Sequence, residues 1–122
     1  MENKGYNKSS IVLYKAEDNS IQLEVKLEHE TVWLNIEQMT QLFGRDRTVI
    51  TRHINNVFKD GEVEKSLGCA KFAHPKDYGR RKGFVQTGQL DYYNLDVIIS
   101  VGYRVHSSQG VAFRRWATKI LK

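Results

Sequence analysis

The sequence predicts one α+β domain, in which a small antiparallel sheet carries a winged-helix-like helix-turn-helix and a C-terminal amphipathic helix. Three observations lead to this fold class. Apolar and polar residues alternate early in the chain, a helical repeat replaces the alternation after Asn35, and a second helical repeat ends the sequence. A chain of 122 residues with 40% hydrophobic and 27% charged residues also has the size and composition of a single globular domain. We expect a loose tail over residues 1–8 and the domain over residues 9–122.

The segment at 11–34 has the pattern of three antiparallel strands. The stretch IVLY at 11–14 is apolar and favours a strand, and the EDNS that follows Ala16 has the chemistry of a turn. The middle strand alternates polar residues with Ile21, Leu23, Val25 and Leu27. Because successive side chains of a strand point to opposite faces, we expect one buried and one wet face. A turn at 29–30 then leads to a short strand at 31–34, whose Trp33 we expect in the core.

A helix-turn-helix is predicted directly after these strands. Asn35 can cap the first helix, and Gln38 three residues later makes a polar variant of the capping box. The helix then has one apolar stripe, made of Ile36, Met39, Leu42 and Phe43. Gly44 suits the left-handed residue that ends a helix, and Asp46 can cap the next one, which we place over 46–59. Two helices joined by a short turn with a glycine have helix-turn-helix spacing.

The second half of the chain predicts a hairpin and two more helices. We expect strands from Leu67 to Ala73 and from Phe84 to Tyr93, around a basic turn. The stretch NLDVIISVGYRV begins with Asn94 as a cap and is interpreted as a helix, although its β-branched residues also fit a strand. The last helix has an apolar stripe of Phe113, Trp116, Ala117, Ile120 and Leu121. This pattern runs to the final residues, so we expect the natural chain to continue.

Positive charge is concentrated in the second half of the chain. The net charge is +5, yet residues 1–34 hold four lysines against six carboxylates. Residues 71–82 hold five cations against Asp77, and residues 104–122 hold five cations and no carboxylate. A basic half favours a polyanionic partner, because neutralised phosphates release condensed counterions. An ordinary solvated surface remains the alternative on charge alone.

The second helix of the pair has the residues of a DNA-reading helix. At about 100° per residue, Ile50, Ile54, Val57 and Phe58 share one side, and the opposite side has no carboxylate. Arginine and asparagine can make bidentate contacts with guanine and adenine, and threonine can contact phosphate or a thymine methyl group. We predict double-stranded DNA binding by Arg45, Arg47, Thr48, Thr51, Arg52, Asn55 and Lys59. A plain surface helix is the alternative.

The basic turn of the hairpin is the candidate wing. A strand-turn-strand after a recognition helix can place its tip on phosphates or in a minor groove. The DNA-contacting residues predicted here are Lys76, Arg80, Arg81 and Lys82. The alternative is a solvated run of charge, and the two interpretations are compatible because such a tip can order on binding.

Catalytic, metal and cofactor motifs are not evident. The four histidines are widely spaced and Cys69 is the single cysteine, so we predict neither an enzyme nor a metal or cofactor site. A Cys69–His74 thiol–imidazole pair is less favoured than a buried cysteine near a loop histidine. A single-strand stacking platform is less favoured than core packing for the aromatic residues Tyr92, Tyr93, Tyr103, Phe113 and Trp116. Lacking a membrane-length apolar run or a secretory signal, the sequence predicts a cytoplasmic protein.

Several long blocks resemble a known family. These blocks are ETVWLNIEQMTQLFGRDRTVITRHINNVFKDGE, CAKFAH and YYNLDVIISVGYRVHSSQGVAFRRWATKILK, in that order. Together they resemble the N-terminal region of the RhuM family of bacterial virulence-associated proteins over roughly residues 10–122. The order of strands, helix pair and FRRW helix is more distantly similar to the N-terminal domain of viral Bro proteins and phage antirepressors. These resemblances imply a helix-turn-helix DNA-binding domain from a bacterial, nucleoid-associated protein.

The sequence therefore predicts specific double-stranded DNA binding in transcriptional regulation. We expect a homodimer, because a single helix-turn-helix usually binds too weakly alone and paired half-sites correct this. The alternative is a protein-interaction module of antirepressor type that binds a repressor or a host factor. Salt separates the two, since DNA affinity falls steeply and log-linearly with salt concentration whereas an apolar protein groove is nearly indifferent to it.

Overall fold

The computed structural model describes residues 10–77 and 85–122. Its strands are β1 (Ser10–Lys15), β2 (Gln22–Glu28), β3 (Thr31–Leu34), β4 (Cys69–Asp77) and β5 (Val85–Asn94). Its helices are α1 (Ile36–Phe43), α2 (Arg47–Lys59), α3 (Lys65–Gly68), α4 (Leu95–Arg104) and α5 (Ser108–Ile120). The strands form one antiparallel sheet in the order β1-β2-β3-β5-β4. The predicted α+β class is confirmed.

The first three strands form the predicted meander. β2 pairs with β1 on one side and with β3 on the other, with Val25 opposite Val12 and Lys26 opposite Trp33. The chain passes from β2 to β3 through two residues with positive φ, 52° at His29 and 62° at Glu30. Two such residues make the tight turn that matches the twist of a hairpin.

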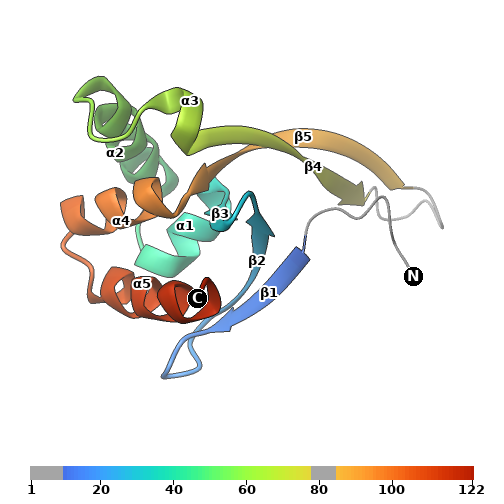
Figure 1. The fold of residues 1–122 in the computed structure, drawn as a ribbon, viewed down its shortest axis with the longest axis horizontal. Coiled ribbons are helices and arrows are strands. Elements are labelled where there is room, and N and C mark those ends of the chain that lie inside the picture. Colours follow the sequence, from blue (N-terminus) through green and yellow to red (C-terminus); the bar gives the residue numbers. More distant parts are fainter. Residues whose placement is uncertain (1–9, 78–84) are drawn as a thin grey trace.

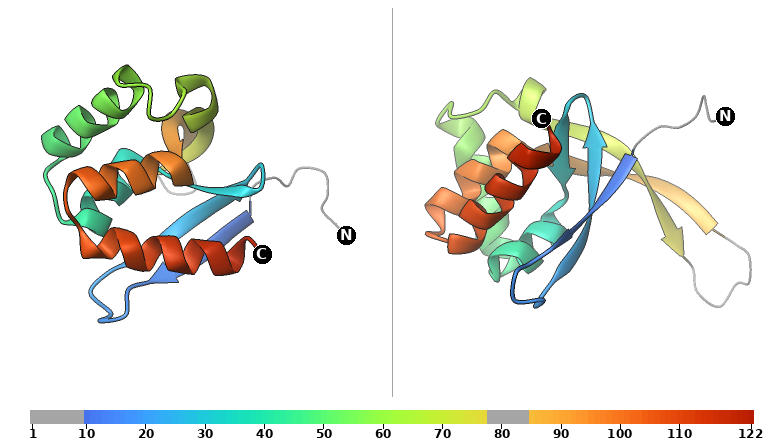
Figure 2. Two further views of the ribbon diagram at one scale, coloured as in Figure 1. Left: turned by 60° about the vertical axis from the view of Figure 1, so that its left-hand side comes forward. Right: turned by 60° about the horizontal axis from the view of Figure 1, so that its bottom comes forward.

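The helices gather on one side of the sheet, and β4 and β5 extend past them as a long hairpin (Figure 1). Figure 2 shows α4 and α5 lying side by side and joined by a short connection. One hydrophobic core joins the sheet to these helices. Its members that are at most 1% exposed include Val25, Val32, Leu34, Met39, Leu42, Ile50, Val57, Val97, Ile98, Val101 and Phe113.

The helix pair has the predicted caps. The Asn35 side chain accepts a hydrogen bond from the Gln38 backbone N–H at 2.9 Å, and Gln38 Oε1 accepts one from the Asn35 N–H at 3.0 Å. Gly44 ends α1 with a left-handed φ of 64°, and the Asp46 carboxylate accepts from the Thr48 N–H at 3.2 Å to begin α2. Met39, Leu42, Ile50, Ile54 and Val57 are buried, so the predicted packing of the pair is confirmed.

The later elements confirm most of the predictions and correct two. NLDVIISVGYRV contains helix α4, with the Asn94 side chain accepting from the Val97 N–H at 3.1 Å, so the strand alternative is wrong. Leu67 does not begin a strand, because it lies in the single turn of α3 with 67% of its surface exposed. Tyr103 does not pack in the core, because its position on α4 leaves it 85% exposed. The winged-helix detail stays a prediction.

Three sequence predictions fall on residues that the structure does not describe. The loose tail over residues 1–8 is one, and the tip of the basic turn with Arg80, Arg81 and Lys82 is another. The side chain of Lys76, at the end of β4, is the third. The proposed contacts of these basic residues with DNA therefore rest on sequence.

Candidate nucleic-acid interface

The outer side of α2 carries the predicted reading residues. Thr48, Arg52, Asn55 and Lys59 are exposed, opposite the buried Ile50, Ile54 and Val57. A shallow hollow of about 500 Å³ runs along this side, and no carboxylate lines it. Its lining residues are Arg47, Thr48, Thr51, Arg52, Asn55 and Asn56. We call these six residues the α2 face.

Packing of its apolar side and hydrogen bonds at its start hold α2 in place. Its apolar side contacts α1 and α4, and the Asp46 cap fixes where it begins. Arg45, in the turn before α2, donates from Nη2 to the carbonyl oxygen of Val105 at 2.9 Å. This bond ties the turn to the C-terminal end of α4. Arg45 is predicted from sequence to contact DNA, and the structure shows a partner within the protein that the sequence did not indicate.

The α2 face keeps its positive charge. The Asp46 carboxylate is engaged in capping the Thr48 N–H at the start of the helix. Glu37 lies 3.9 Å from Arg47 with both side chains largely exposed, and an ion pair of this kind contributes little. At the other end of α2, Asp60 and Glu62 both accept from Arg104, whose Nη2 lies 2.9 Å from Asp60 Oδ2. These carboxylates are therefore neutralised from α4.

His53 flanks the α2 face, and its surroundings lower the pKa of its imidazole. Its Nδ1 is buried and has no hydrogen-bond partner among the described residues. Burial lowers the pKa of His53, and the positive charges of Arg52, Arg104 and Arg45 lower it further. The imidazole therefore has a packing role at neutral pH, as its place at the edge of the apolar stripe suggests.

The structure brings five of the predicted residues together and adds one. Arg47, Thr48, Thr51, Arg52 and Asn55 line a common hollow, whereas Arg45 is engaged with α4 and Lys59 lies exposed beyond the lining. Asn56 was not predicted. It lies about 120° from Ile50 on the helix, so the periodicity places it at the border of the outward side. Its polar amide side chain at this position could have indicated a DNA contact from sequence.

The described part of the chain offers little support for a reactive thiol, a metal site or a membrane-spanning helix. Burial raises the pKa of the Cys69 thiol, which disfavours the reactive thiolate. Burial also raises the pKa of Tyr93, its partner in the sheet, to about 12. Within residues 10–77 and 85–122, no three His, Cys, Asp or Glu side chains are placed to share a metal ion. None of the helices described there is both long and apolar enough to cross a membrane.

Comparison with known proteins finds a family similarity over part of the chain. No curated protein and no solved structure matches the chain significantly. Residues 69–122 match the sequence model of the Virulence protein RhuM family. This segment contains β4, β5, α4 and α5, while the resemblance over residues 10–68 and the similarity to Bro proteins stay predictions. The match over residues 69–122 is consistent with a RhuM-family domain and supports the resemblance that the sequence predicts.

Proposed function

We propose that this domain binds double-stranded DNA sequence-specifically, with α2 in the major groove, and that it regulates transcription. One observation carries the proposal: the α2 face exposes arginine, asparagine and threonine side chains, and no carboxylate lines it. These are the side chains that make paired hydrogen bonds with base edges and single ones with phosphates. An α-helix also has the width that the major groove admits.

Arg52 and Asn55 are the proposed base readers. They lie three residues apart on an exposed helical side, so their side chains are neighbours and can enter the same groove. Neither has an ion pair or side-chain hydrogen bond within the described residues, so DNA contact would break no protein contact. Arg47 and Thr48 lie in the first turn of α2 and are proposed to contact flanking phosphates.

The proposal also includes contacts by the hairpin and a dimeric state, both of which would raise the affinity for DNA. The basic residues of the hairpin, Lys76 and Arg80 to Lys82, are proposed to contact the DNA backbone only. We propose a homodimer on paired half-sites, because one small module gives limited affinity. The proposed role is one of binding rather than catalysis, at the bacterial nucleoid.

The experiment begins with selection of a preferred duplex from random DNA. Fluorescence anisotropy then compares the preferred and a scrambled duplex at several salt concentrations. We expect Arg52→Ala to cost about 1–3 kcal/mol on the preferred duplex and to narrow its advantage over the scrambled one. Arg81→Ala should weaken both duplexes alike and make the log–log salt slope shallower by about one unit. Arg115→Ala, which removes an exposed cation from α5, is the matched control.

Three outcomes would contradict the proposal. An equal loss of affinity for both duplexes in Arg52→Ala would show that α2 contacts the DNA backbone and not the base edges. Unchanged affinity of Arg52→Ala for both duplexes would show that Arg52 does not contact DNA and would argue against α2 as the interface. A domain that selects no duplex, yet binds a protein with little dependence on salt, would support the antirepressor-type alternative.

A further inference from the structure

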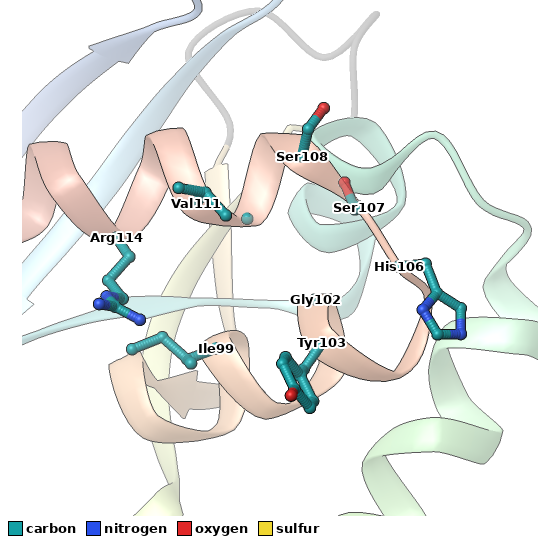
Figure 3. Close-up of a pocket in the computed structure, with 9 residues that line it drawn as sticks. Ile99, Gly102, Tyr103, His106, Ser107, Ser108, Val111 and Arg114 are labelled. Atoms are coloured by element: carbon teal, nitrogen blue, oxygen red, sulfur yellow. The ribbon is translucent and has the colours of Figure 1, made fainter.

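A groove lies between α4 and α5, on residues that the α2 face does not include (Figure 3). Its volume is about 510 Å³. One wall comes from α4 and the other from α5, and the connection between the helices closes one end. The lining residues are Ile99, Gly102, Tyr103, His106, Ser107, Ser108, Gly110, Val111 and Arg114.

Two glycines make the floor of this groove. Gly102 of α4 and Gly110 of α5 face each other so closely that a Cβ added to Gly110 would lie 3.4 Å from the Gly102 Cα. The Phe43 ring lies beneath both, 3.1 Å from a Cβ added to Gly102. The helices therefore meet backbone to backbone, and no side chain rises from the floor. This leaves room for a side chain from another molecule.

The walls of the groove expose apolar surface that the fold leaves uncovered. Tyr103 is 85% exposed and Val111 is 55% exposed, on opposite sides of the glycine floor. Burying these side chains against a partner would be favourable by about 25 cal/mol for each Å² of apolar surface removed from water. Aromatic residues at the rim of a hollow are typical anchors of protein–protein interfaces.

Arg114 gives the groove a positive charge without a counter-charge. It is exposed, it lines the groove, and no carboxylate lines the groove with it. The next residue, Arg115, lies about 100° further round α5 and lines a neighbouring hollow with Glu17 and Asp18. The two adjacent arginines therefore have opposite surroundings, one with carboxylates from the β1–β2 turn and one without.

We infer that this groove binds a protein segment carrying a bulky apolar side chain next to a carboxylate. The apolar side chain occupies the space above the glycines, between Tyr103 and Val111, and the carboxylate pairs with Arg114. A second copy of this chain fits less well, because it would bring the cations of two α5 helices together. Nucleic acid fits less well because its phosphates would gain nothing from the apolar walls. The inference does not depend on DNA binding by α2.

The test uses a random 12-residue peptide library displayed on phage, selected on the whole domain. Counter-selection uses the Tyr103→Ala/Arg114→Glu variant, whose altered residues are both exposed, so its unfolding transition should match that of the unaltered domain. We expect the enriched peptides to share a large apolar residue within a few positions of Asp or Glu. A synthetic consensus peptide should shift the backbone NMR signals of Gly102 and Gly110. Its affinity should fall by about tenfold or more in Arg114→Glu and stay within about twofold in Arg115→Glu.

A charge swap provides the second arm of the test. A consensus peptide with lysine in place of its carboxylates should bind Arg114→Glu better than it binds the unaltered domain. Enriched peptides without carboxylates, or no enrichment against the double variant, would overturn the inference. Concentration-dependent dimerisation that Tyr103→Ala abolishes would assign the groove to a second copy. Duplex DNA that shifts the Gly102 and Gly110 signals would assign it to nucleic acid.

Discussion

Two glycine-to-alanine substitutions should change stability in opposite directions. Gly68 ends α3 and is buried where this turn meets α2 and α4. A Cβ added there would lie 2.7 Å from Val63 Cγ1, 2.8 Å from Val97 Cγ2 and 3.2 Å from Phe58 Cε1. Two of these distances are shorter than any van der Waals contact. Val63 lies in a loop and can shift, but Val97 is fully buried and cannot.

The magnitude follows from two opposing effects. Overpacking a core with a methyl group costs about 1–3 kcal/mol. Alanine also restricts the unfolded chain, which stabilises the folded state by about 0.4–1 kcal/mol where the backbone accepts it. Gly68→Ala should therefore lower the free energy of unfolding by about 1–2 kcal/mol. At Gly110 the nearest atoms to an added Cβ lie at 3.4 Å, an ordinary contact, so Gly110→Ala should raise it by about 0.4–1 kcal/mol.

Urea unfolding followed by circular dichroism measures both variants against the unaltered domain. Equal denaturant slopes would show that the variants differ in stability and not in the surface exposed on unfolding. A Gly68→Ala variant as stable as the unaltered domain would refute the reasoning. So would a change of the same sign at both glycines, because the close contacts at Gly68 would then have no consequence.

Three further predictions concern the core, a cap and a histidine. Phe113→Ala removes a ring that is 0% exposed and lies 5.1 Å from the Tyr14 ring, so it should cost about 3–5 kcal/mol in urea unfolding, whereas Val111→Ala on the same helix should cost far less. Asn35→Ala should cost about 1 kcal/mol through loss of the capping box, and an unchanged urea midpoint would contradict this. Because the folded state lowers the pKa of His53, the unfolded chain takes up this proton first, so stability should fall as pH drops below about 6.5. In His53→Gln the fall between pH 7.5 and 5.5 should be smaller, and an identical fall would assign the pH dependence to other groups.

Local chemistry explains why much of the fold could be predicted. The Asn35–Gln38 capping box and the turn glycine at 44 satisfy backbone groups close to them in sequence, so their pattern is visible without tertiary information. The alternation of Leu23 and Val25 with polar neighbours likewise reports the buried face of one strand. The α2 face was predictable for the same reason, because the spacing of residues along a helix determines which side of the helix each one occupies.

Other features depend on contacts that no local pattern reveals. The bond from Arg45 to the Val105 carbonyl spans 60 residues, and the Gly102–Gly110 contact joins two different helices. Tyr103 was predicted in the core because it is aromatic and lies near an apolar stripe. Six residues after Val97, it is turned about 120° away from that buried position, so helical geometry places it outside. Leu67 lies in a helix of one turn, which is too short to show a period.

The place of β5 in the sheet bears on how this chain can be divided. The family match begins at Cys69, yet β5, which follows this point, lies between β3, which precedes it, and β4. The core likewise mixes residues from both sides, such as Val25 and Phe113. A cut before Cys69 would leave β3 with an unpaired edge in one fragment, and in the other it would separate α4 and α5 from strands β1 to β3. The start of the match is thus a boundary in sequence similarity and not a boundary between structural units, so we expect neither fragment to fold alone.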